Sequence, residues 1–204
     1  MNAEEIVAGM EKNQKEMEKK IKDMSYTIFV KVPTGDVSRT GETDVLYKKP
    51  KKYKIILKKN SSIRLIIVTN GTVTWLYRPP KNSVRIVNVS SQDFVPLIDY
   101  AKSIKFMLNS SSIAEYKGTE LIENRKAHKI MLVLKKQRDN FSYWFWMDDK
   151  TGLLLKTQTH QDDEPVMTLE HRNFEINTGI PDSEFEFVIP EGVKVIRKDG
   201  QLYR

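Results

Sequence analysis

The most informative pattern of apolar and polar positions lies in residues 140–159. Two apolar runs flank residues 148–152, Asp-Asp-Lys-Thr-Gly, whose Asp and Gly residues are typical of a tight turn. In the first run Trp144 and Trp146 alternate with Phe145 and its apolar neighbours, so both faces of a strand would be apolar. A sheet with one face in water alternates apolar with polar residues instead. We therefore expect this hairpin to be covered on both faces or to border a cavity.

The same period of two runs through most of the chain after residue 25 and favours strands rather than helices. Short turns, among them Asn70-Gly71, join the first six of these segments in sequence, which predicts an antiparallel meander. Residues 193–196 are a candidate for one further strand. The eleven predicted strands are residues 26–32, 41–47, 53–57, 63–68, 72–77, 84–89, 113–122, 125–135, 143–147, 153–159 and 166–176.

Residues 2–24 have a helical period instead. Asn2 and Glu5 have the spacing of a capping box, in which each side chain accepts a hydrogen bond from the other residue's backbone. Three of the five apolar residues on one side are Met, a flexible side chain that suits core packing against a sheet or contact with a variable ligand. The stripe consists of Ile6, Met10, Met17, Ile21 and Met24.

A second helix is predicted over residues 96–108, where Pro96 would occupy the first turn. Its apolar stripe is broader than a surface helix needs, and Ser and Asn residues flank it on both sides. A lid that moves over an apolar ligand and a static helix that plugs the sheet are both consistent with this pattern.

The net charge of +7 suits an anionic partner such as a membrane surface. The densest basic run, residues 48–52, falls at a predicted turn and is read as a solvated turn in preference to a nucleic-acid patch, since no nucleic-acid-binding motif accompanies it. The longest apolar runs are too short to span a bilayer. We expect no nucleic-acid partner.

The sequence contains no recognisable catalytic signature. There is no Cys, and His128, His160 and His171 lie in separate predicted strands without the spacing of a metal site. The motifs of serine hydrolases, nucleotide hydrolases and dinucleotide enzymes are absent. Adjacent carboxylates at Asp148 and Asp149 are explained by the turn that they form. We expect no enzyme activity, no catalytic residue, no metal and no cofactor.

Three loose motifs and the chain's ending, taken in order, resemble the LolA-like superfamily of outer-membrane lipoprotein-sorting proteins. The motifs are residues 47–55 (YKKPKKYKI), 70–77 (NGTVTWLY) and 146–156 (WMDDKTGLLLK), and the ending is residues 174–187 (FEINTGIPDSEFEF). The amphipathic first helix fits the same order, so the resemblance covers nearly the whole chain.

The resemblance implies an α+β fold, an incomplete and half-open antiparallel β-barrel of about eleven strands covered by helices, over residues 1–204 as a single domain. It implies a periplasmic or otherwise extracytoplasmic location. No signal-peptide pattern is visible, so either the protein is intracellular or its signal has already been removed. The expected partners are a lipid or lipoprotein acyl chain and a membrane surface or membrane-bound acceptor protein. We expect the protein itself to be a monomer.

We therefore expect a carrier that buries an acyl chain in a hydrophobic cavity and transfers it without chemistry. The alternative is a sensor or protein-interaction domain of the same fold, in which side chains fill the cavity. The candidate lipid-binding residues are the large apolar side chains of the two helices and of the strands: Met10, Met17, Phe29, Trp75, Tyr77, Ile98, Ile104, Met107, Trp144 and Trp146.

Overall fold

The computed structural model describes residues 2–34, 37–88, 100–135, 140–197 and 202–203. Their secondary structure comprises two α-helices, two short 3-10 helices and thirteen strands. The chain divides into two compact units. The helical unit consists of residues 1–20, 29–39 and 97–172, and the meander unit consists of residues 21–28, 40–96 and 173–204. Strands β1 (Asp23–Thr34), β2 (Val37–Lys48) and β11 (Glu164–Ile176) each contribute residues to both units.

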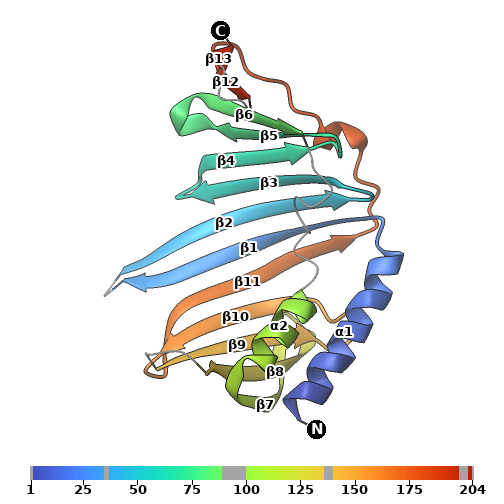
Figure 1. Cartoon of the computed structure of the whole chain (residues 1–204), viewed down its shortest axis with the longest axis vertical. Coiled ribbons are helices and arrows are strands. Elements are labelled where there is room, and N and C mark those ends of the chain that lie inside the picture. Colours follow the sequence, from blue (N-terminus) through green and yellow to red (C-terminus); the bar gives the residue numbers. More distant parts are fainter. Residues whose placement is uncertain (1, 35–36, 89–99, 136–139, 198–201, 204) are drawn as a thin grey trace. The chain divides into compact units, whose positions relative to one another are not determined.

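The helical unit is an antiparallel sheet with two helices on one face. Its strands pair antiparallel in the order β11-β10-β9-β8-β7. Tight turns join β7 to β8, β9 to β10 and β10 to β11. Helices α1 and α2 lie side by side over these strands (Figure 1). The elements introduced here are α1 (Ala3–Lys20), α2 (Tyr100–Asn109), β7 (Ser111–Ile122), β8 (Arg125–Leu134), β9 (Phe141–Asp148) and β10 (Leu154–Gln161).

Helix α1 begins with the capping box that the sequence predicts. Asn2 Oδ1 accepts a hydrogen bond from the Glu5 amide at 2.8 Å, and Glu5 Oε2 accepts one from the Asn2 amide at 3.0 Å. These bonds satisfy backbone donors that the first helical turn leaves without partners. The buried side of the helix carries Ile6 and Met10 at helical spacing.

The helix ends earlier than its apolar stripe suggested. The predicted helix extends to residue 24, whereas α1 ends at Lys20 and Met24 belongs to β1. The backbone at the junction is bonded to a distant residue, because Asn177 Oδ1 accepts the Lys22 amide at 2.6 Å and the Asn177 amide donates to Asp23 O at 2.9 Å. A helix continued through residue 23 could not make these bonds.

The meander unit contains the first strands of the chain in sequential antiparallel pairing. Strands β2 to β6 follow one another by short turns, as predicted. The hydrogen-bonded order in this unit is β13-β12-β6-β5-β4-β3-β2-β1-β11. The remaining elements of the unit are β3 (Lys52–Lys59), β4 (Ser62–Thr69), β5 (Val73–Arg78), η1 (Pro79–Lys81), β6 (Ser83–Asn88), η2 (Asp182–Phe185), β12 (Lys194–Arg197) and β13 (Leu202–Tyr203).

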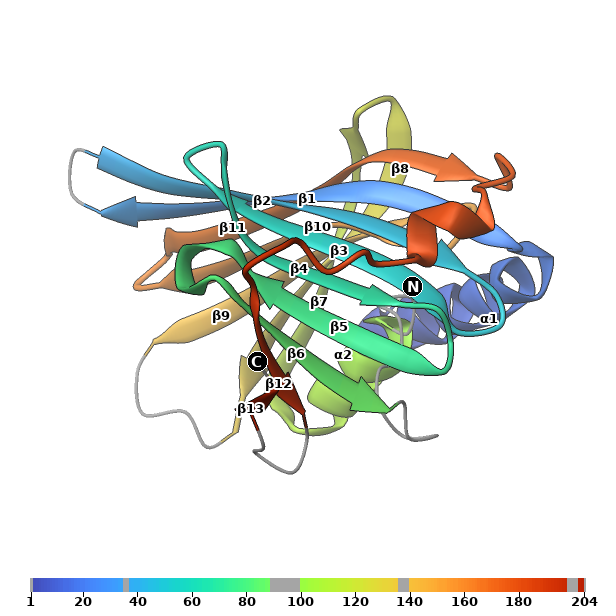
Figure 2. The same cartoon turned by 90° about the horizontal axis from the view of Figure 1, so that it is seen from above.

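The end of the chain returns to the far side of the meander. After η2 an extended segment runs across strands of the unit to β12 (Figure 2). Strand β12 pairs with β6 in parallel, with Val195 opposite Val84. Asn82 anchors this approach, since its carbonyl accepts the Lys194 amide and its Nδ2 donates to Gly192 O, both at 3.0 Å. The sequence suggested a last strand at this position but not its parallel pairing.

The predicted α+β fold with a mostly antiparallel sheet and covering helices is confirmed. All eleven predicted strands are present, and β12 and β13 add to them within the described residues. Helix α2 spans Tyr100–Asn109 and so ends one residue beyond the predicted bounds of 96–108, whereas residues 96–99 of the prediction lie outside the described residues. The prediction of a single domain over residues 1–204 stays a prediction.

Gly152, in the turn between β9 and β10, provides a test of how closely α1 approaches the sheet. Its φ is +69°, and a Cβ at this position would lie 2.4 Å from the carbonyl oxygen of Met10. We expect Gly152→Ala to lower the free energy of unfolding by roughly 1–3 kcal/mol through backbone strain, with further loss from the clash. Urea denaturation measures the change.

Gly9→Ala is the matched control, because Gly9 lies within α1 and a Cβ there would meet nothing within 4 Å. Since Ala is the better helix former, this change should raise the free energy of unfolding by up to about 1 kcal/mol. Equal effects of the two substitutions would contradict the close approach at residue 152.

Candidate functional site

The candidate site is the interface between the two helices and the sheet of the helical unit. Side chains from α1, α2, β8, β9 and β10 form one buried apolar cluster there. Ile104 of α2 is 1% exposed and Met10 of α1 is 5% exposed, and Met107 is half-buried at the edge of the cluster. The sheet contributes Ile130, Leu132, Phe145, Met147 and Leu154. Three predicted site residues, Met10, Ile104 and Met107, therefore meet at this interface.

Helix α2 is tied to α1 by an exposed ion pair. Glu11 of α1 accepts hydrogen bonds from Lys105 Nζ of α2 and from Lys15 Nζ of α1, both at 2.7 Å. These two bonds lower the pKa of Glu11 to about 2, so the carboxylate is ionised at neutral pH. On the outer side of α2, Phe106 is 74% exposed. Among the described residues, apolar contacts with the sheet and the Lys105–Glu11 ion pair with α1 hold α2 in place.

A hydrogen-bonded chain lies at the edge of this interface. His128, which is 6% exposed, places Nδ1 3.0 Å from the Tyr116 hydroxyl and Nε2 2.6 Å from Asp149 Oδ1. The hydrogen bond with His128 holds the pKa of Asp149 below its usual value. Asn13 of α1 donates to the Asp149 carbonyl at 3.0 Å, which connects the chain to the helix. Sequence reasoning missed this set, because its members lie in four separate segments.

Trp144 and Trp146 lie on the other face of β9 from the residues that meet the helices. The two rings stack at 6.4 Å, and Lys129 Nζ lies within 5.0 Å of both ring centroids. Trp146 Nε1 donates to Glu120 at 2.8 Å, a bond that lowers the pKa of Glu120. Lysine side chains and a carboxylate therefore cover the second apolar face of this strand.

Trp75 and Tyr77 belong to the meander unit and contact its C-terminal segment. Phe187, which follows η2, packs against both rings, with centroids 6.4 Å from Trp75 and 5.6 Å from Tyr77. These two predicted residues therefore pack beneath the segment that crosses the sheet in Figure 2.

Two further predicted residues, Phe29 and Met17, are not part of the helix–sheet cluster. Phe29 of β1 lies under the Arg172 guanidinium at 5.0 Å, and Met17 is half-buried near the end of α1. Ile98 lies outside the described residues. The assignment of a lipid-binding role to each of these ten residues stays a prediction.

Two of the four lysines in the basic run at residues 48–52 make contacts within the meander unit. Lys48 and Lys52 pair with the two carboxylate oxygens of Asp182 at 2.7 and 2.8 Å. Their hydrogen bonds lower the pKa of Asp182 to about 2. Lys48 also donates to Ile180 O at 2.7 Å. These lysines hold η2 against the hairpin of β2 and β3 instead of forming a free basic patch.

The described residues contain no group of three or more His, Cys, Asp or Glu side chains that could hold a metal ion. Among the same residues, no helix is both long enough and apolar enough to cross a membrane.

Residues 14–189 match the MucB/RseB N-terminal domain. The chain belongs to this family. The match covers α2, the strands of the helical unit and most of the meander, whereas Met10 and the other buried α1 residues of the cluster precede it. The LolA-like resemblance drawn from the sequence is confirmed.

This MucB/RseB N-terminal domain is 26% identical over 199 residues to an uncharacterized protein of Methanocaldococcus jannaschii. The alignment covers 96% of this chain and 54% of that protein, so the chain spans about half the length of this relative.

Two solved structures share the fold. An uncharacterized conserved protein from Thermus thermophilus superposes with a TM-score of 0.58 at 12% identity, covering 96% of this chain and 99% of that one. MucB of Pseudomonas aeruginosa, solved as a complex with MucA, superposes with a TM-score of 0.57 at 11% identity, covering 89% of this chain and 61% of that one. At these identities the likeness shows the fold alone.

His171 of β11 is a buried titratable group in this MucB/RseB N-terminal domain. It is 3% exposed, and burial lowers its pKa from 6.5 to about 4. The folded state therefore binds a proton more weakly than the unfolded state does. As the pH falls from about 6.5 to about 4, we expect the free energy of unfolding to fall by up to ~3 kcal/mol from this residue.

Urea denaturation at several pH values between 7 and 4.5 tests this expectation. The His171→Leu variant should show a flatter dependence of unfolding free energy on pH, since it has no imidazole to protonate. Leu169→Ala in the same strand is the control, and it should lower stability by a similar amount at every pH. An unchanged slope in His171→Leu would show that another group sets the acid sensitivity.

Proposed function

We propose that this domain is a non-enzymatic binding domain that takes an acyl chain of a lipid or lipoprotein between α2 and the sheet of the helical unit. The proposal rests on one observation: the contact between α2 and the sheet is apolar. Ile104 and Met107 pack on an apolar sheet face, and the described ion pair to α1, Lys105 with Glu11, lies at the side. An acyl chain that entered between α2 and the sheet would meet the apolar side chains of this cluster.

The free energy needed to uncover the apolar side chains of α2 is similar in size to the free energy gained by burying an acyl chain. Binding of the acyl chain would therefore be reversible. Uncovering three apolar side chains of α2, those of Ile104, Met107 and Leu108, costs about 1.5–3 kcal/mol each, or roughly 5–9 kcal/mol together. Burying an acyl chain of about fourteen carbons returns about 11 kcal/mol at 0.8 kcal/mol per methylene. The balance favours binding by a modest margin, as a carrier that must also release its ligand requires.

No chemical step is needed for this function. Burial supplies the affinity, so the domain acts without a catalytic residue, metal or cofactor. We place the protein outside the cytoplasm, as a monomer that receives or delivers its ligand at a membrane surface or to a membrane-bound acceptor. Within the site Met10, Ile104 and Met107 would contact the chain.

A second candidate function is protein interaction, as in a sensor domain. Two observations favour it. Side chains fill the interface beneath α1 and α2 among the described residues, and MucB of Pseudomonas aeruginosa, which has a similar fold, was solved as a complex with MucA. In this case the helices would stay closed, and the ligand would be a protein bound elsewhere on the surface.

Hydrogen exchange with and without lipid separates the two functions. If α2 opens for an acyl chain, its amides should exchange faster than those of β9 and β10 in the lipid-free protein and should slow when a long-chain fatty acid is added. Mass spectrometry of an organic extract of the purified protein should also detect acyl lipid. Exchange in α2 that is slow and unaffected by lipid, with no lipid extracted, favours the protein-interaction function.

Two lysines that pair with the same carboxylate allow a matched mutational test. Lys105→Ala removes the ion pair between α2 and α1, whereas Lys15→Ala removes a pair of the same length within α1. Exposed ion pairs contribute about 0.2–1 kcal/mol, so Lys105→Ala should favour the open state and tighten fatty-acid binding up to about fivefold. Fluorescence titration measures the affinity. An equal effect of Lys15→Ala would contradict an opening motion of α2.

A further inference from the structure

A small cavity opens between two turns of the helical unit. It has a volume of about 280 Å³ and lies where the β7–β8 turn approaches the β9–β10 turn. Its lining includes Leu121, Arg125, Lys126, Lys150 and Thr151, with the Asp148 carboxylate among them. None of these residues was singled out as a binding residue in the sequence, and none belongs to α1 or α2.

Hydrogen bonds to one buried carboxylate hold the wall of this cavity. Asp148 is 4% exposed, and its Oδ1 accepts the amides of Lys150 and Thr151 at 3.1 and 2.7 Å and the Thr151 hydroxyl at 2.7 Å. Its Oδ2 accepts Arg125 Nε at 2.8 Å. Burial alone would raise the pKa of Asp148, but the bonds from Arg125 and Thr151 outweigh it and hold the pKa below its usual value. The wall is therefore rigid and carries a fixed negative charge that Arg125 balances.

The remaining charges of the lining are positive. Lys150 is exposed in its turn, and Lys126 is also exposed, with Nζ 3.7 Å from the carboxylate of Asp149. This pair is long, whereas the other oxygen of the Asp149 carboxylate lies 2.6 Å from His128 Nε2. The lining has a formal charge of +2, because it contains three basic residues, Arg125, Lys126 and Lys150, and one carboxylate, that of Asp148. A cavity of this kind attracts anions.

The volume of the cavity and the exposed Leu121 indicate which kind of anion would fit. Pockets for drug-sized ligands typically occupy about 300–1,000 Å³, so 280 Å³ suits a headgroup-sized ligand better than an acyl chain. Leu121 of the lining is 70% exposed, so its side chain is accessible to an apolar part of a ligand next to the anionic group. Ammonium and guanidinium groups together are the usual donors to phosphate oxygens.

We infer that this cavity binds a phosphate group, carried either by a lipid headgroup or by a small soluble phosphate. Lys126 and Lys150 donate to the phosphate oxygens, and Arg125, held by Asp148 and Thr151, contributes fixed positive charge. Leu121 covers the apolar part of the ligand when the phosphate belongs to a lipid. The inference is independent of the acyl-chain site beneath α2, since the two places share no residue.

Titrations with two probes test the inference. Inorganic phosphate should shift the NMR signals of the Lys150 and Thr151 amides and the Arg125 Nε–H. Vesicles that contain phosphatidylglycerol should bind the protein more tightly than vesicles of phosphatidylcholine alone. The double variant Lys126→Ala/Lys150→Ala should weaken both interactions about tenfold or more, given about fivefold for each lysine near an anionic surface.

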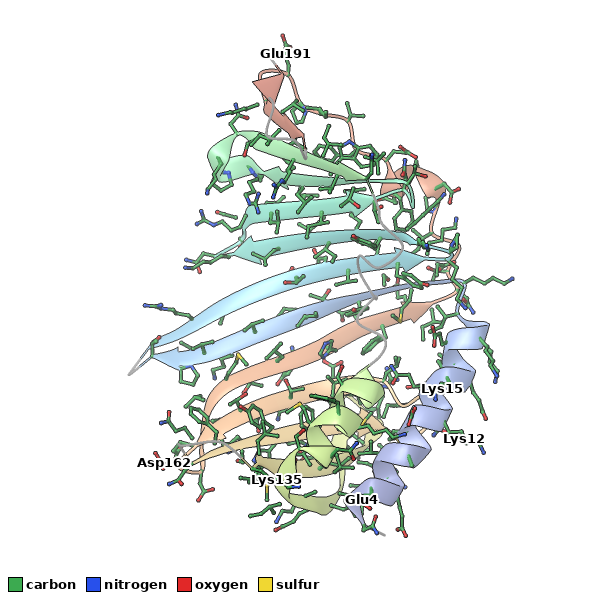
Figure 3. All side chains as sticks on the ribbon, viewed as in Figure 1. Glu4, Lys12, Lys15, Lys135, Asp162 and Glu191 are labelled. Atoms are coloured by element: carbon green, nitrogen blue, oxygen red, sulfur yellow. The ribbon has the colours of Figure 1, made fainter. Side chains whose placement is uncertain are left out.

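The matched control is Lys59→Ala/Lys135→Ala, which removes the same charge at two exposed positions, the end of β3 and the residue after β8 (Figure 3 labels Lys135). It should change each affinity less than twofold. If the double variant does not fold, Lys150→Ala alone, at an exposed turn position, should weaken binding about fivefold. Equal weakening by the control, or no shift of the lining signals with either probe, would overturn the inference.

Leu121→Ser separates the two sources of phosphate. It should weaken vesicle binding and leave inorganic phosphate unaffected if the ligand is a lipid headgroup. An unchanged affinity for both probes, with the lysine variants still defective, assigns the cavity to a soluble phosphate. Both results support a phosphate site, and neither depends on whether fatty acid slows exchange in α2.

Discussion

The Asp148 carboxylate is the contact on which the helical unit depends most. Its two oxygens accept bonds from the backbone and side chain of the turn that follows and from Arg125 of the neighbouring strand. These bonds close the turn that places Gly152 directly under α1, where a side chain would not fit. The position of the helix over the apolar sheet face follows from this turn. Removing the carboxylate would leave the buried Arg125 contact and the turn amides without their acceptor, a loss of several bonds at once.

The two faces of β9 show how one strand can serve two purposes. Phe145 and Met147 join the apolar cluster beneath the helices, whereas Trp144 and Trp146 lie under lysine side chains on the opposite face. Indole rings attract ammonium groups through their π faces, so lysines can cover them while remaining partly in water. Helices therefore cover the apolar side chains on one face of this strand, and charged side chains cover those on the other face.

Local patterns predicted local structure well. The capping box at Asn2 and Glu5, the turn at residues 148–152 and the alternation of β9 depend on residues close in sequence, and all are present. Contacts between distant residues were not predictable in this way. The chain after α1 is bonded to Asn177, and Lys48 and Lys52 bind Asp182. The helical patterns put Met10, Ile104 and Met107 on apolar helix surfaces, and the structure brings these three residues together. The His128–Asp149 pair and the cavity at Lys150 join segments that only the fold brings together.

The parallel pairing of β12 with β6 has a consequence for the order in which the chain can fold. The two strands are separated by about a hundred residues, so the edge of β6 has no partner on that side until residues 194–197 have been synthesised and have crossed the meander. Contacts of such long sequence separation form late and slow the folding of β-rich proteins. An open strand edge is also a template for pairing with other chains. The growing chain therefore has an unpaired edge at β6 until β12 pairs with it.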